Sequence, residues 1–372
     1  MDWAKQNKAY YIALEHRYYG VSNPVSDMST PNMRFLSSEQ ALADAAMFVE
    51  SLQKKYTGPW IVFGCSYSGS LSAWFRLKYP HLVIGSVAPS GPVIPEANFT
   101  QFFNNFEHVA SPACVSATTK AVRQIDGMFA TTQGRATLSS YFNACQPLEA
   151  KDAFMFKWTI TEFLTTTAQW QNPPGNQLDA ACAQMTSNSD AVLGWANAYN
   201  ALNNAPAPQP CTTFTDEAFL APLKQLALGN IDRAWYFQKC TEFGFFQVGY
   251  PGSSIFFGDM TMDQVNFCQR IFGVPNMTPN TQWTHAEYGA LKLRGTNILF
   301  TNGLYDPWHT LSITQHSAGV EAVTYEAAHC APMTAPTAND PPSLTAARQR
   351  VANFIGKLLQ QSGFRNGVKL EM

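Results

Sequence analysis

Charged residues are scarce in this sequence, and the few that it has do not cluster. They make up 13% of the 372 residues, about half of the usual share of roughly 25% in globular proteins. The formal net charge is −2, and no basic or acidic block occurs. Proteins that bind nucleic acid or an anionic membrane concentrate positive charge in one region. We therefore expect neither as a partner.

Long apolar runs and a recognisable export signal are also missing. No apolar run reaches the ~18 residues that a membrane-spanning helix needs, so we expect no membrane segment. The first residues, Met1 to Lys8, contain neither the apolar stretch nor the cleavage site of a signal peptide. The cysteines and sequons described next nevertheless indicate export. We therefore expect that the N-terminus, with its signal peptide, is missing from this chain.

None of the eight cysteines forms a C-x-x-C pair, so the sequence predicts no metal site and no cofactor. Six of them, from Cys114 to Cys268, recur at intervals of about thirty residues, as in a disulfide-stapled region from an oxidising compartment. Their connectivity stays open, because six cysteines allow 15 pairings. The sequons at Asn98 and Asn276 predict two glycosylation sites. We expect a secreted, lysosomal or vacuolar protein.

Apolar runs alternate with helical patterns in the first ninety residues. A capping box with Ser37 as N-cap and Gln40 three residues later predicts the start of one helix. A second helical pattern runs from Ser70 to Tyr79, where Pro80 follows. Buried strands are predicted at 9–15, 60–64 and 82–88. Such alternation is typical of a parallel sheet covered by helices on both faces.

The alternation stops in the middle of the chain and returns near its end. Residues 95–290 contain amphipathic helical segments and no clear strand series. The last part predicts strands at 297–301 and 320–326 and helices at 309–317 and 344–361. We therefore predict an α/β fold in which residues 1–94 and 291–372 form a catalytic domain. Residues 95–290 would be a large helical, disulfide-bonded insertion.

The hexapeptide from Gly64 to Gly69 lies at a predicted junction between a strand and a helix. In α/β hydrolases such a turn lifts a nucleophilic serine out of the sheet, and the helix N-terminus offers N–H groups to an oxyanion. Ser66 is thus the candidate nucleophile, and the backbone N–H of Tyr67 is a candidate oxyanion donor. The usual pattern is G-x-S-x-G, whereas here the second glycine comes one residue late. An ordinary Ser/Gly turn is the alternative.

Asp306 and His329 follow the two late strands, in the order Ser, acid, His that α/β hydrolases use. Each residue alone could be a turn cap or a surface residue. Together they predict a triad in which Ser66 attacks a carbonyl, His329 transfers the proton and Asp306 orients the imidazole.

Several stretches around these residues are similar to stretches of a known protein family. They are Leu14–Ser22, the Gly64–Gly69 turn (the elbow) with the segment that follows it up to Pro80, Asn302–Trp308, Ala328–Cys330 and Cys240–Phe246. In them the chain resembles the serine peptidase family of prolyl carboxypeptidase, dipeptidyl peptidase II and thymus-specific serine protease. The resemblance spans nearly the whole chain and is strongest to the thymus-specific branch.

This resemblance implies an α/β-hydrolase fold with a helical cap, and an exopeptidase that cleaves peptides beside proline. Either a C-terminal residue or an N-terminal dipeptide would be released, and a homodimer is possible. It also implies that Trp308 lines the proline pocket, although a core tryptophan is an equal interpretation. Ser70 stands where prolyl carboxypeptidase has a methionine near that pocket, so Ser70 is a second pocket candidate.

Two departures from the family qualify these expectations. Cys65 stands where the family usually has glycine, and we interpret it as a small buried residue or a reactive thiol. The run at 9–15 corresponds to the fourth strand of a hydrolase sheet, so the earlier strands and their oxyanion donor have no counterpart. We therefore predict a fragment that is weakly active or unstable alone.

Two other functions remain open from the sequence. A lipase or esterase could use the same three residues, and a non-catalytic binding protein could keep the fold without turnover. The sequence does not distinguish a dipeptidyl peptidase from a carboxypeptidase.

Overall fold

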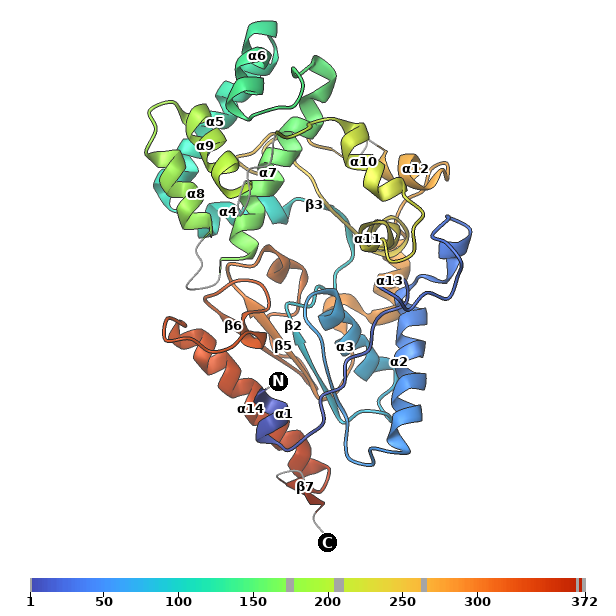
Figure 1. Ribbon diagram of the computed structural model, residues 1–372. Coiled ribbons are helices and arrows are strands. Elements are labelled where there is room, and N and C mark those ends of the chain that lie inside the picture. The colour runs from blue at the N-terminus through green and yellow to red at the C-terminus, as the bar shows by residue number, and fades with distance from the viewer. Residues whose placement is uncertain (1, 172–176, 204–210, 262–265, 366–367, 370–372) are drawn as a thin grey trace.

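A four-stranded parallel sheet organises the protein (Figure 1). The computed structural model describes residues 2–171, 177–203, 211–261, 266–365 and 368–369. The strands of the sheet are β1 (Ile61–Phe63), β2 (Gly85–Pro89), β5 (Ile298–Gly303) and β6 (Val320–Tyr325). Their order across the sheet is β1-β2-β5-β6, and every neighbouring pair is parallel. The four strands predicted at 60–64, 82–88, 297–301 and 320–326 are confirmed, with small shifts at their ends.

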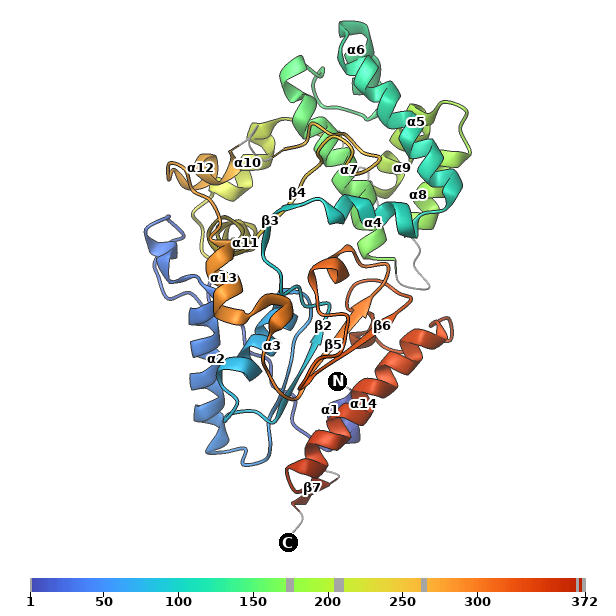
Figure 2. The ribbon, with the colours of Figure 1, turned by 180° about the vertical axis from the view of Figure 1, so that it is seen from behind.

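Helices cover both faces of this sheet, as the alternating pattern predicts. The helices α2 (Ser38–Gln53) and α3 (Tyr67–Lys78) lie on one face, and α14 (Pro342–Gln361) lies on the other (Figure 2). Successive strand residues point to opposite faces. Accordingly, Leu299 packs in the cluster of α14, while its neighbour Phe300 packs in the cluster that contains Trp74 of α3. Both faces of the sheet are therefore buried.

The predicted start of α2 is confirmed at the level of a single hydrogen bond. The side chain of Ser37 accepts from the backbone N–H of Gln40 at 3.2 Å. This bond satisfies one of the N–H groups that have no partner within the first turn of a helix.

The middle of the chain is largely helical, as predicted, and α4 to α9 gather above the sheet in Figures 1 and 2. The boundaries drawn at 94/95 and 290/291 stay a prediction. The helices of this region are α4 (Gln101–Val109), α5 (Pro112–Phe129), α6 (Thr132–Tyr141), α7 (Ala153–Gln169), α8 (Gln177–Thr186), α9 (Ala191–Asn203), α10 (Asp216–Lys224), α11 (Ile231–Gln238), η3 (Lys239–Phe243), α12 (Phe267–Phe272) and α13 (Thr281–Tyr288).

Two short strands interrupt this helical region, contrary to the sequence analysis. β3 (Glu96–Phe99) pairs in parallel with β4 (Gly244–Gln247). Four residues are too few to show a clear alternation of apolar and polar positions. Gly244 has a φ of 74°, and a Cβ at this position would lie 2.5 Å from the Cα of Ala97. Only glycine fits this close contact without strain.

The disulfide-bonded character of the insertion is confirmed. Cys114 pairs with Cys182, Cys145 with Cys211 and Cys240 with Cys268. The interpretation of Cys65 as a small buried residue or a reactive thiol is wrong, because Cys65 forms a disulfide with Cys330. Two cysteines that the sequence separates by 265 positions cannot be paired from spacing alone.

Two predicted elements near the ends of the chain are also wrong. Residues 9–15 form no strand and are exposed, with 77% of Tyr10 accessible. An apolar run becomes a buried strand only beside another strand, and no described strand pairs with this one. In place of the helix at 309–317 there is a 3₁₀ turn, η6 (Pro307–Leu311), capped by Asp306.

None of the helices in the described ranges combines the length and apolar character that a bilayer crossing requires.

Candidate active site

Three loops meet at the carboxyl edge of the sheet. Ser66 follows β1, Asp306 follows β5, and His329 follows β6. Because these strands are parallel, all three loops leave the sheet at the same edge. Side chains that are far apart in sequence can therefore meet there.

Ser66 sits in a sharp turn between β1 and α3. Its φ is 61° and its ψ is −131°, a conformation that residues with a side chain rarely adopt. Its backbone N–H donates to the carbonyl oxygen of Pro89 at 3.0 Å. A Cβ on Gly64 would collide with the carbonyl oxygen of Ser68, and one on Gly69 would lie 2.7 Å from that of Pro89. The late glycine of the motif is thus required by the packing of the turn.

Asp306 and His329 form a buried hydrogen-bonded pair. The distance between His329 Nδ1 and Asp306 Oδ2 is 2.7 Å, and the residues are 3% and 0% exposed. The second carboxylate oxygen, Oδ1, accepts from the backbone N–H of Trp308 at 3.1 Å. An ionised carboxylate only accepts hydrogen bonds, so Nδ1 carries the proton of the neutral imidazole. His329 Nε2 is then the basic nitrogen.

The loop that carries His329 is held by contacts that sequence reasoning missed. The backbone N–H of His329 donates to the carbonyl oxygen of Gln169, the last residue of α7, at 3.0 Å. The next N–H, that of Cys330, donates to Ser90 Oγ at 3.0 Å. The ring of Trp170 stands edge-on to the His329 ring, with centroids 5.3 Å apart. No sequence signal marks these residues, because α7 lies far from His329 in the chain.

Tyr67, the candidate oxyanion donor, is the first residue of α3. Its backbone N–H therefore has no acceptor within the helix. Its hydroxyl group accepts from Gln238 Nε2 at 2.8 Å and lies 3.2 Å from His16 Nε2. Burial raises the pKa of Tyr67 well above its ordinary value. The stretch around His16 and the insertion both hold the elbow through this side chain.

The two pocket candidates differ in their surroundings. Trp308 is half-buried and donates from Nε1 to Gln169 Oε1 at 3.0 Å. Its ring packs against Phe99, Phe102 and Phe245, with centroids 5.0, 5.9 and 5.2 Å away. Ser70 is 1% exposed, and its hydroxyl donates to the carbonyl oxygen of Pro92 at 2.6 Å. A pocket role stays a prediction for both residues.

Comparison with known proteins identifies the family. The profile of the family described as serine carboxypeptidase S28 matches residues 1–351. The chain belongs to this family. It is 31% identical to thymus-specific serine protease of Mus musculus, over 93% of this chain and 74% of that protein. It is 30% identical to lysosomal Pro-X carboxypeptidase of Homo sapiens, over 97% of this chain and 78% of that protein. The protein is therefore a serine-type peptidase.

A likeness to a solved structure is weaker. The S28 chain matches the epoxide hydrolase VrEH1 from Vigna radiata with a TM-score of 0.33 and 14% identity, over 93% of this chain and 81% of that one.

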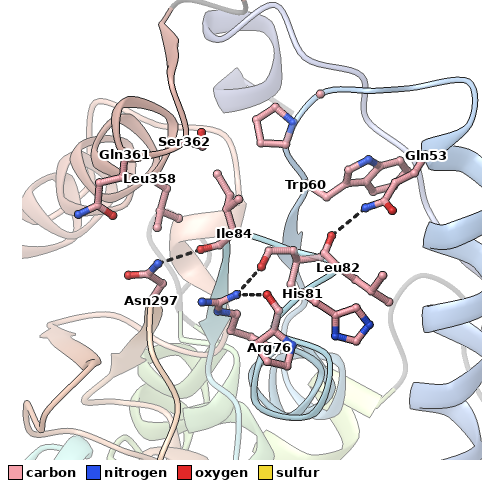
Figure 3. A pocket seen from close by; sticks show the side chains of 14 residues that line it. Gln53, Trp60, Arg76, His81, Leu82, Ile84, Asn297, Leu358, Gln361 and Ser362 are labelled. Carbon is pink, nitrogen blue, oxygen red and sulfur yellow. Dashed lines mark hydrogen bonds between the residues drawn. The ribbon is translucent and has the colours of Figure 1, made fainter. Parts of the chain in front are cut away.

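A surface pocket of this S28 peptidase lies away from the three loops. Its volume is about 400 Å³, and its lining includes Trp60, Ile84 and Asn297, which directly precede β1, β2 and β5 (Figure 3). Arg76 donates to the carbonyl oxygens of Pro80 and Val83 there. The pocket thus lies at the amino ends of β1, β2 and β5, opposite to the triad candidates.

One group of side chains has the arrangement of a metal site. The ligand atoms of Cys65, His329 and Cys330 lie within 4.8 Å of one another. Metals bind the thiolate form of cysteine, and these two sulfurs are joined to each other. The group therefore cannot act as a thiolate site while the disulfide is intact.

Proposed function

We propose that this S28 peptidase is an exopeptidase that cleaves peptides next to proline through an acyl-enzyme on Ser66. The observation that carries the proposal is the bond from His329 Nδ1 to Asp306 Oδ2. This pair lies at the sheet edge where the Ser66 elbow also ends.

The proposed reaction uses each of the three residues in turn. Ser66 Oγ attacks the peptide carbonyl carbon while His329 Nε2 takes the hydroxyl proton. The resulting imidazolium gives this proton to the leaving amine, and the acyl group stays on Ser66. Water then attacks the ester with His329 again as the base. Asp306 keeps the imidazole in the tautomer that this sequence needs and stabilises its cationic form.

The oxyanion that forms in each step needs hydrogen-bond donors. We assign one of them to the backbone N–H of Tyr67, at the N-terminus of α3. A single donor of this kind contributes about 10²–10³ in rate.

A preference for proline is supported by the aromatic surroundings of the acid. Trp308 donates its backbone N–H to Asp306 and packs on three phenylalanines. A rigid proline ring packs well on a flat aromatic wall, and Trp170, which is 47% exposed beside His329, would extend this wall. The name of the human relative says that it acts on Pro-X bonds, which agrees with this assignment.

The compartment that fits this enzyme is a lysosome or the secretory route. Four disulfides use all eight cysteines, and disulfides persist in oxidising compartments. The two sequon asparagines, Asn98 and Asn276, are exposed and so accessible to glycosylation. Peptides are the expected substrates.

A peptide panel followed by mass spectrometry tests the proposal. The panel contains peptides with X-Pro at the N-terminus, peptides with Pro-X at the C-terminus, matched peptides with alanine for proline, and short-chain esters. We expect hydrolysis at the proline bond of one terminal class, and a loss of about 10⁴–10⁶ in kcat in Ser66→Ala. Ser68→Ala, which changes an exposed neighbour, is the control. Equal turnover of the alanine peptides, or a preference for the esters, would contradict the proposal.

A further inference from the structure

The disulfide between Cys65 and Cys330 joins the two loops that the proposed reaction depends on. Cys65 directly precedes Ser66, and Cys330 directly follows His329. The Cα atoms of the two cysteines are 5.9 Å apart. The covalent link therefore runs alongside the pair of residues that must exchange a proton.

Strand pairing does not join these two loops to each other directly. β1 and β6 are the outer strands of the order β1-β2-β5-β6, so no backbone ladder joins them. Three interstrand spacings of about 4.8 Å place them roughly 14 Å apart. The loops must reach across the ends of β2 and β5 to meet. A covalent bond between them supplies the restraint that strand pairing does not.

Both loops also hold unfavourable backbone conformations next to the disulfide. Ser66 has a φ of 61° and Cys330 has a φ of 58°. Such residues keep these conformations only when several contacts impose them. The hydrogen bonds of Ser66 to Pro89 and of Cys330 to Ser90 are two of these contacts. The disulfide links the two loops to each other covalently.

We propose that the Cys65–Cys330 disulfide is a redox-sensitive clamp that positions Ser66 against His329. This inference rests on the proposed function. Both cysteines are partly exposed, so a dithiol reductant can reach them. One thiolate of the reductant attacks a sulfur, breaks the bond between the two cysteines and forms a mixed disulfide. Its second thiolate then closes the oxidised reductant, and the protein gains two electrons and two protons as two thiols. The loops then separate, and turnover falls.

The test compares the oxidised and reduced forms of the wild type. The protein is treated with dithiothreitol in the presence of EDTA, because the freed thiols and His329 could otherwise bind metal ions. Mass spectrometry counts the thiols, and circular dichroism monitors the fold. We expect kcat to fall by about 10²-fold, which is the effect of misplacing a catalytic group by about 1 Å. KM should change little, and reoxidation should restore kcat.

Two double variants distinguish an effect of the clamp on kcat from the loss of stability that removing any disulfide could cause. Cys65→Ala/Cys330→Ala should show the lower kcat from the start and no further response to dithiothreitol. Cys145→Ala/Cys211→Ala removes a disulfide that also reaches the surface but lies in the helical region. It should keep the wild-type kcat and its sensitivity to reduction.

A second readout keeps this inference distinct from the proposed function. The rate of fluorophosphonate labelling of Ser66 does not depend on the peptide that the enzyme prefers. Unchanged labelling and kcat in a protein whose Cys65 and Cys330 are shown to be reduced would overturn the clamp. Full activity of the Cys65→Ala/Cys330→Ala variant would do the same. An oxidised wild type that neither labels nor hydrolyses any substrate would instead refute the proposed function.

Discussion

Asp306 shows how much of the candidate site depends on the environment of one side chain. Its carboxylate is fully buried, and its two oxygens accept from two different groups, the His329 ring and the Trp308 N–H. The second of these bonds also caps the 3₁₀ turn that places Trp308. The residue therefore orients both the proposed base and the proposed pocket wall.

Replacing Asp306 with asparagine should preserve the shape of this site and remove its function. An asparagine amide can donate to Nδ1 and thereby favour the wrong tautomer of His329. In a triad where the exchange has been made, kcat falls by about 10⁴. We expect a similar loss of kcat, measured on the best peptide substrate, with an unchanged circular dichroism spectrum. Glu326→Gln, which changes an exposed acid in the loop that carries His329, is the control. A variant with more than a tenth of the wild-type kcat would show that Asp306 does not serve the base.

Gly303, at the end of β5, should tolerate no side chain. A Cβ at this position would collide with the carbonyl oxygens of Ala327 and Ala328, directly before His329. Gly303→Ala should therefore displace the His329 loop and lower both kcat and the melting temperature. Gly127→Ala in α5, where a Cβ meets nothing within 4 Å, is the matched control. That change should leave kcat intact and raise stability by up to about 1 kcal/mol. Equal effects of the two substitutions would argue against the packing described for Gly303.

Among the elements, η3 contains a buried lysine that makes stability depend on pH. Lys239 is 4% exposed, and its ammonium group lies over the rings of Tyr236 and Phe246. Burial lowers the pKa of Lys239 from 10.5 to about 7, while the charge of Glu162 acts in the opposite direction. The charged form of Lys239 is thus costly in the folded state.

This cost should disappear as the pH rises. Below pH 7 the lysine is protonated in both states, so the folded state bears the full cost of burying the charge. Between about 7 and 10.5 the folded form loses the proton while the unfolded chain keeps it, and the folded state gains stability. Lys239→Met should therefore raise the melting temperature most at pH 6, and less at pH 9.

The comparison is made in a Glu162→Gln background, so that the charge of Glu162 does not vary with pH. The lysine pKa should lie even lower there, because Glu162 no longer raises it. The effect is the difference in melting temperature between Glu162→Gln and Glu162→Gln/Lys239→Met, measured by thermal unfolding across this pH range. A difference in melting temperature that is independent of pH would refute the burial argument.

Sequence patterns within one segment predicted correctly those features that depend on residues close together in the chain. The cap at Ser37 needs only the N–H three residues later, and it is present. The run at 9–15 has the composition of a strand, yet it is exposed because nothing in the described structure pairs with it. The helix predicted at 309–317 fails because Asp306 and Pro307 favour a short 3₁₀ turn. The hydrophobic periodicity of one segment shows neither whether another strand pairs with it nor whether a nearby cap favours a different turn.

At the scale of the whole molecule, the sequence predicted the place of the candidate triad in the fold, because the parallel strands impose that place. Ser66, Asp306 and His329 each follow a strand, and one sheet brings the ends of those strands to one edge. The support of the site could not be predicted in this way. Gln169, Ser90 and the Cys65–Cys330 bond reach the His329 loop from distant segments, and only the folded chain brings them together.

The most direct test of the account is covalent labelling of the proposed nucleophile, Ser66. The protein is reacted with a fluorophosphonate, digested and mapped by mass spectrometry. We predict a single adduct on Ser66, formed far more slowly in His329→Ala and absent in Ser66→Ala. An adduct that persists in Ser66→Ala, or labelling of Ser66 at the same rate without His329, would contradict the claim that these loops form one catalytic site.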